Sequence, residues 1–309
     1  MKYLFLAIIL LSVISTQTSA LAQSNSIIVD YHHTAPTKFI EANGTRYAYR
    51  VLGKNSGIPL VLFQHFTGTM DYWDPLVVNG LAHNYQVILF DNKGVGATSG
   101  STPDNIQQMA LDAIDFINAL GYAKVNLLGF SMGGFIAQQV ALDQPQLVNK
   151  IILAGTGPQG SIGLSDIVKP LTESAKMSPE DVKLFLFYSP SARSRALGKE
   201  SLARIHKRTI NRDPEASNES IMLQLKSILA WAQPDAEALE RLKTLNKPVL
   251  IVNGNNDILV PTINSYNMYQ AFPDARLVLY PDANHGSIFQ YPALFLKEVT
   301  AFLAEGSKN

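Results

Sequence analysis

Three residues far apart in the sequence, Ser131, Asp257 and His285, are of the types that carry out nucleophilic catalysis on acyl compounds. Ser131 is the centre of Gly129-Phe-Ser-Met-Gly133, which matches the pattern Gly-x-Ser-x-Gly. Asp257 and His285 each follow an apolar run by a few residues. In the triad that this order predicts, His285 removes the Ser131 proton, Asp257 orients the imidazole, and Ser131 forms an acyl-enzyme that water clears.

The residues around Ser131 predict the sharp turn that would expose its hydroxyl. The run from Val125 to Leu128 is typical of a buried strand, and residues 134–143 are typical of a helix. Gly129 and Gly133 would let this strand and helix approach closely, because neither carries a Cβ. The free N–H groups at the start of the helix would then point at the place where an oxyanion develops.

The loops that carry the acid and the base also follow predicted strands. Residues 248–253 and 276–280 are apolar runs, and Asp257 and His285 come after them. Polar residues at the carboxyl ends of strands are where sites form in open α/β sheets. Asp282 is an alternative acid, but only three residues separate it from His285, so we expect Asp257 to fill this role.

With these motifs the chain resembles the α/β-hydrolase superfamily over most of its length. The segment from His65 to Trp73 is similar to the oxyanion loop of that family, with Phe66 in place of the usual glycine. The resemblance implies that the backbone N–H groups of Thr67 and Met132 form the oxyanion hole.

Apolar runs alternate with helical patterns along the chain, which predicts an α/β fold: a mostly parallel sheet with helices on both faces. The expected strands are residues 46–51, 60–64, 86–91, 124–128, 150–154, 248–253 and 276–280. The expected helices outside the long insertion are near residues 103–120, 132–144, 263–271 and 292–305.

About 90 residues between the fifth and sixth of these strands have no strand signal, which predicts a helical cap over the site. Helices are expected from Ser178, over 218–231 and over 235–245. The predicted organisation is a core of residues 23–157 and 246–309 with a cap of residues 158–245. The apolar side chains of the cap favour a substrate with an apolar portion.

The composition excludes several classes of protein. The chain has no Cys, so thiolate nucleophiles and disulfides are ruled out. It has 25 basic and 25 acidic residues and no basic run, so nucleic acid is not an expected partner. No motif for a metal or a cofactor is found, and none is expected. The adjacent His32 and His33 predict a solvated pair on a strand.

The N-terminus predicts export. Lys2 precedes an apolar run from Tyr3 to Ile14, and Ala20-Leu-Ala22 is typical of a signal-peptidase site with cleavage after Ala22. This run of about 12 residues is shorter than the ~20 needed to cross a membrane. Residues 1–22 are therefore predicted to be a signal peptide, and the mature protein to be periplasmic or secreted without a stable membrane anchor.

Together these features predict an exported serine hydrolase that cleaves carboxylic esters or related small acyl compounds. The resemblance leaves other chemistries open, because cofactor-free haloperoxidases (perhydrolases) and C–C bond hydrolases use the same triad. A homologue that binds a small ligand without catalysis is a further alternative. The oligomeric state stays open.

Overall fold

The computed structural model describes residues 29–55 and 57–306 of the chain. Eight strands form one sheet in the order β1-β2-β4-β3-β5-β6-β7-β8. The strands are β1 (Lys38–Ala42), β2 (Thr45–Leu52), β3 (Leu60–Phe63), β4 (Val87–Phe90), β5 (Val125–Phe130), β6 (Val148–Ala154), β7 (Val249–Gly254) and β8 (Ala275–Tyr280).

Helices of two kinds connect these strands. The α-helices are α1 (Tyr31–Thr34), α2 (Pro75–Asn84), α3 (Ile106–Ala119), α4 (Met132–Asp143), α5 (Val168–Ser174), α6 (Pro179–Phe187), α7 (Ala192–Ile205), α8 (Asn218–Trp231), α9 (Ala238–Lys243), α10 (Ile263–Ala271), α11 (Ser287–Gln290) and α12 (Pro292–Ala304). Two 3-10 helices are η1 (Met70–Tyr72) and η2 (Leu164–Ile167).

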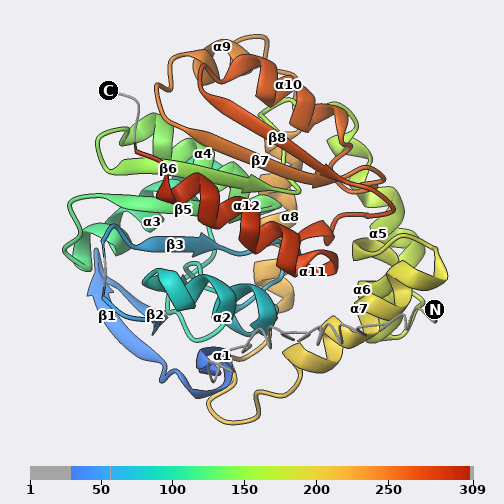
Figure 1. The fold of residues 1–309 in the computed structure, drawn as a ribbon, viewed down its shortest axis with the longest axis horizontal. Coiled ribbons are helices and arrows are strands. Elements are labelled where there is room, and N and C mark those ends of the chain that lie inside the picture. Colours follow the sequence, from blue (N-terminus) through green and yellow to red (C-terminus); the bar gives the residue numbers. More distant parts are fainter. Residues whose placement is uncertain (1–28, 56, 307–309) are drawn as a thin grey trace, which may run out of the picture.

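The sheet is antiparallel only at the edge that contains β1 and β2, and β3 to β8 are parallel. In Figure 1, α2 and α12 lie in front of the sheet and α3 and α4 lie behind it. Because both faces are covered, every residue of β3, β4 and β5 is buried. The predicted α/β fold is therefore confirmed.

All seven predicted strands are present, and β1 is an eighth that the sequence analysis missed. Most residues of β1 are exposed or half-buried, so it lacks the apolar run that identifies a buried strand. Helix α2 was not predicted either, although Asp74 caps this helix and Pro75 begins it. The prediction for His32 was wrong: it lies in α1 rather than a strand, and it is buried.

The stretch between β6 and β7 is helical, as expected. The helices predicted from Ser178 and over 218–231 are α6 and α8, and the Ser178 hydroxyl accepts a hydrogen bond from the Asp181 amide as the N-cap of α6. Helices α5 and α7 were not predicted. Figure 1 shows α5, α6 and α7 beside the carboxyl ends of β7 and β8.

The predicted signal peptide lies outside the described residues. Within residues 29–55 and 57–306, no helix is long and apolar enough to cross a membrane.

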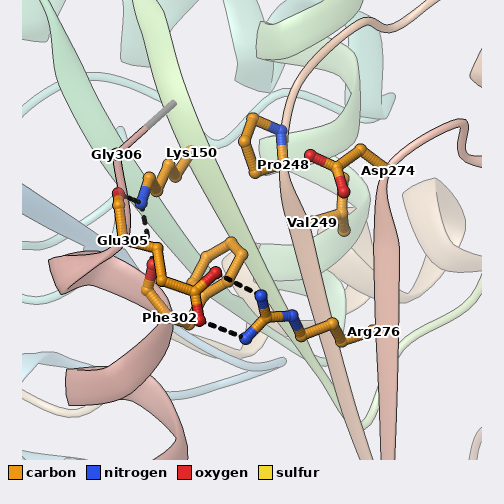
Figure 2. Close-up of a pocket in the computed structure, with 8 residues that line it drawn as sticks. All are labelled: Lys150, Pro248, Val249, Asp274, Arg276, Phe302, Glu305 and Gly306. Atoms are coloured by element: carbon orange, nitrogen blue, oxygen red, sulfur yellow. Dashed lines mark hydrogen bonds and ion pairs between the residues drawn. The ribbon is translucent and has the colours of Figure 1, made fainter. Parts of the chain in front are cut away.

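Lys150 of β6 ties the end of α12 to the sheet (Figure 2). Its ammonium donates to the carbonyl oxygens of Phe302 at 2.7 Å and Leu303 at 3.3 Å, and to that of Glu305. Carbonyls in the last turn of a helix have no partner within the helix, so the lysine satisfies them. Arg276 of β8 also holds this end, through a hydrogen bond of 2.8 Å to the Glu305 carboxylate.

We expect Lys150→Met to lower the free energy of unfolding by about 1–2 kcal/mol, because it leaves buried helix-end carbonyls without donors. The Arg276 and Glu305 side chains are about half exposed. Arg276→Met, the matched control, should therefore cost less than about 1 kcal/mol. Denaturant midpoints of the two variants measure the difference, and equal losses would contradict this role for Lys150.

Candidate active site

Asp257 and His285 meet at the carboxyl ends of β7 and β8. The His285 Nδ1 and the Asp257 Oδ2 are 2.9 Å apart, and both side chains are buried. The other carboxylate oxygen of Asp257 accepts hydrogen bonds from the Leu259 and Val260 amides, each at 2.9 Å. These two bonds fix the rotamer of the carboxylate. The carboxylate then holds the imidazole with Nδ1 as the donor, which leaves Nε2 as the acceptor.

Asp282, the alternative acid, lies in a different environment. Its Oδ2 accepts a hydrogen bond of 2.6 Å from the Ser191 hydroxyl, which also caps α7. The structure therefore places Asp257, and not Asp282, against His285.

Ser131 lies on the turn between β5 and α4, and its backbone is strained. Its φ is +56° and its ψ is −123°, a conformation that side-chain-bearing residues rarely adopt. The Ser131 amide donates to the Ala154 carbonyl at 2.9 Å, and the Thr156 hydroxyl donates to the Ser131 carbonyl at 2.8 Å. Both bonds tie the turn to the end of β6, so the surrounding structure holds the strained residue in place.

The two glycines of the turn are required by packing. A Cβ on Gly129 would collide with the Gly133 carbonyl oxygen, and a Cβ on Gly133 would collide with the Phe63 carbonyl oxygen of β3. The first turn of α4 thus packs directly on the backbone of two strands. This confirms the prediction that the glycines permit close approach.

Ser131 and His285 open into one cavity of about 150 Å³. Polar groups are few on its walls, and its apolar lining residues are Phe66, Ile167, Leu171, Val182, Leu186, Phe187 and Leu259. Most of these come from η2, α5 and α6, so the insertion between β6 and β7 forms much of the wall. A largely apolar cavity with a few convergent polar groups is typical of a small-molecule site.

The two amides predicted to bind an oxyanion, those of Thr67 and Met132, differ in whether they already donate a hydrogen bond. The Thr67 amide donates to the side-chain oxygen of Gln224 in α8 at 2.9 Å, so its hydrogen is already taken. Thr67 also has a φ of +64°, which turns the loop. Met132 is the first residue of α4, where an amide has no partner within the helix. Thr67 is therefore not a free donor here, and the role of the Met132 amide stays a prediction.

Two features of this loop were not predicted from the sequence. Among the described residues, none accepts a hydrogen bond from the Phe66 amide, and Phe66 lines the cavity. The side-chain oxygen of Gln224 accepts from the Thr67 amide of this loop, and its amide nitrogen donates to the Ser220 hydroxyl at 2.9 Å. A glutamine on a predicted amphipathic helix gives no sequence signal for such a contact.

His65 and Lys183 are further polar residues of the cavity wall. Burial lowers the pKa of His65 well below its ordinary value, and the nearby Lys183 ammonium lowers it further. His65 Nδ1 lies 2.6 Å from the Phe66 carbonyl oxygen, which orients the ring. Lys183 was not singled out in the sequence, because one lysine on a cap helix is usually solvated.

Within the described part of the chain, no three His, Asp or Glu side chains are grouped so as to hold a metal ion.

Comparison with known proteins identifies the family. The family profile described as "alpha/beta hydrolase fold" matches residues 58–292. The chain is 47% identical to the solved structure of an alpha/beta hydrolase fold protein from Chitinophaga pinensis, with a TM-score of 0.86, covering 89% of this chain and 99% of that one.

Two relatives whose activity is named have lower sequence identity to this chain. A Mycobacterium tuberculosis protein provisionally described as a non-heme bromoperoxidase is 28% identical over 258 residues, covering 81% of this chain and 95% of that protein. The pimeloyl-[acyl-carrier protein] methyl ester esterase of Nitrosomonas europaea is 25% identical over 261 residues, covering 78% and 94%. The chain belongs to the α/β-hydrolase family.

Proposed function

We propose that this protein is a serine hydrolase that cleaves carboxylic esters or related small acyl compounds through an acyl-enzyme on Ser131. One observation carries the proposal. His285, which is hydrogen-bonded to the buried Asp257 at 2.9 Å, lines the same cavity as Ser131, a serine held in a strained turn. A relative described as a methyl ester esterase supports ester hydrolysis in this family.

In the proposed mechanism, His285 Nε2 takes the proton of the Ser131 hydroxyl while the oxygen attacks the substrate carbonyl. Asp257 stabilises the imidazolium that forms. The imidazolium then gives its proton to the departing alcohol, and Ser131 keeps the acyl group. A water molecule, activated by the same imidazole, releases the acid and restores the serine.

The oxyanion of each tetrahedral intermediate needs donors aimed at it before the reaction begins. We propose the Met132 amide as one donor. For the second, the Phe66 amide is favoured over the Thr67 amide, because Gln224 already accepts from Thr67. Binding through Thr67 would first require α8 to release it.

Two further parts of the proposal rest on the sequence. We propose that residues 158–245 act as a cap that closes the cavity, and that residues 1–22 are removed on export. After expression in a bacterial host, N-terminal sequencing of the extracytoplasmic fraction should begin at Gln23. A chain that begins at Met1 and stays inside the cell would refute export.

We expect the mature protein to release p-nitrophenol from a chain-length series of p-nitrophenyl esters, with a short-chain optimum set by the cavity. Ser131→Ala should lower kcat by roughly 10⁶-fold, because no other residue supplies the nucleophile. Release rates measure both effects. If Ser131→Ala hydrolysed the esters as fast as the wild type, the assignment of the nucleophile would fail.

We expect Asp257→Asn to lower kcat by about 10⁴-fold with little change in folding, because asparagine would favour the wrong imidazole tautomer. Asp282→Asn is the matched control, since Asp282 bonds to Ser191 and not to His285. Its kcat should stay within about twofold of wild type. Steady-state kinetics of the two variants compare these residues, and a larger loss in Asp282→Asn would reverse their roles.

A further inference from the structure

Lys183 of α6 brings a positive charge to the wall of the apolar cavity. Its Nζ lies 4.5 Å from the centre of the Tyr72 ring and 5.4 Å from that of Phe187. The side chain also borders a second, smaller cavity of about 20 Å³. Lys183, His65 and Phe187 line both cavities, so they form the wall between them.

Within residues 29–55 and 57–306, this ammonium has no hydrogen-bond acceptor. Among the described residues, none forms a hydrogen bond or an ion pair of 4.0 Å or less with Lys183 Nζ. Glu215 attracts it from a greater distance, but that carboxylate accepts from the Tyr72 hydroxyl at 2.7 Å and pairs with Arg212 at 3.7 Å. Among the described residues, the close contacts of the charge are the two aromatic faces of Tyr72 and Phe187.

Two other cations that are buried or half-buried are paired directly with carboxylates. Arg50 binds Asp71 at 2.6 Å and Asp213 at 2.8 Å. The half-buried Arg204 binds Asp74 at 2.7 Å. Lys183 is half-buried, and a charge partly removed from water without such a partner costs free energy, so a structural lysine would be expected to have one. Lys183 instead lies where a bound substrate could supply the partner.

The cation and the catalytic histidine are close to each other. The Phe187 ring neighbours both groups, with its centre 5.4 Å from Lys183 Nζ and 5.5 Å from the centre of the His285 ring, and Lys183, His285 and Ser131 line the same cavity. A substrate whose carbonyl carbon lies at Ser131 would therefore reach the ammonium with the far end of a short chain.

We propose that Lys183 binds a carboxylate at the far end of the acyl group, so that the substrate is the monoester of a short dicarboxylic acid. This inference rests on the proposed function. The apolar walls would pack the methylene chain, and the ammonium would supply a charge-assisted hydrogen bond to the carboxylate. Lys183 is then a specificity-determining residue and takes no part in bond breaking.

Burial lowers the pKa of Lys183 to about 8, which keeps it a cation at neutral pH but not far above it. The titratable groups that interact with the ammonium are Glu215, Tyr72 and His65, and beyond them Arg212 packs on Tyr72 and His285 on Phe187. Because the neutral amine cannot attract a carboxylate, the preference for a charged ester should fade as pH rises above about 8.

The test compares monomethyl adipate with methyl hexanoate, which differ by a carboxylate in place of the terminal methyl group. Hydrolysis is followed by pH-stat titration. In the wild type, kcat/KM should favour the adipate ester by about 10-fold or more, since a charged hydrogen bond is worth about 1.5–3 kcal/mol. Lys183→Met should abolish this ratio or invert it, and Lys183→Arg should retain part of it.

Lys176→Met is the matched control, because it removes the same charge from an exposed position just before α6. Its ratio should equal that of the wild type. A wild type without the preference, or a Lys183→Met variant that keeps it, would overturn the inference while leaving the hydrolase function intact. Melting temperatures verify that the variants fold.

A binding measurement separates this inference from the proposed function. Ser131→Ala protein, titrated with monomethyl adipate by calorimetry, should bind the ester, and the Ser131→Ala/Lys183→Met double variant should bind it at least about 10-fold more weakly. Equal binding by the two proteins would overturn the carboxylate site. Lys183-dependent binding without any turnover by the wild type would refute the hydrolase function alone.

Discussion

The close approach of the first turn of α4 to the backbones of β3 and β5 governs where Ser131 can lie. Gly129 and Gly133 permit backbone contacts that a residue with a Cβ could not make. Ser131, between them, has a strained backbone with a φ of +56°. Hydrogen bonds from the turn to the end of β6 keep it in this conformation. The sheet thus presents one side chain at its carboxyl edge, beside the start of a helix.

The other parts of the site are arranged around that point by the parallel sheet. Because β7 and β8 run in the same direction as β5, their following loops reach the same edge, where Asp257 and His285 meet. The insertion between β6 and β7 then closes the cavity with apolar side chains. It also brings in Lys183, whose charge has no direct partner among the described residues. In our account, core residues perform the chemistry and the insertion selects the substrate.

The sequence was sufficient for the buried strands and the elbow, because continuous apolar runs and the Gly-x-Ser-x-Gly spacing are local signals. It was not sufficient for features set by long-range packing. Thr67 is bonded by Gln224, more than 150 residues away, and no local pattern reports such a contact. His32 is buried because α1 packs on α2, whereas its neighbours suggested a solvated strand. Lys183 becomes distinctive only once the cavity is known.

The central claim is that Ser131 carries the acyl group during turnover. Mass spectrometry of wild-type protein, acid-quenched within milliseconds of mixing with a p-nitrophenyl ester, tests it most directly. We predict an adduct of the acyl mass on the peptide that contains Ser131, formed in step with a burst of p-nitrophenol. Steady hydrolysis without any adduct, or an adduct on another residue, would contradict the account.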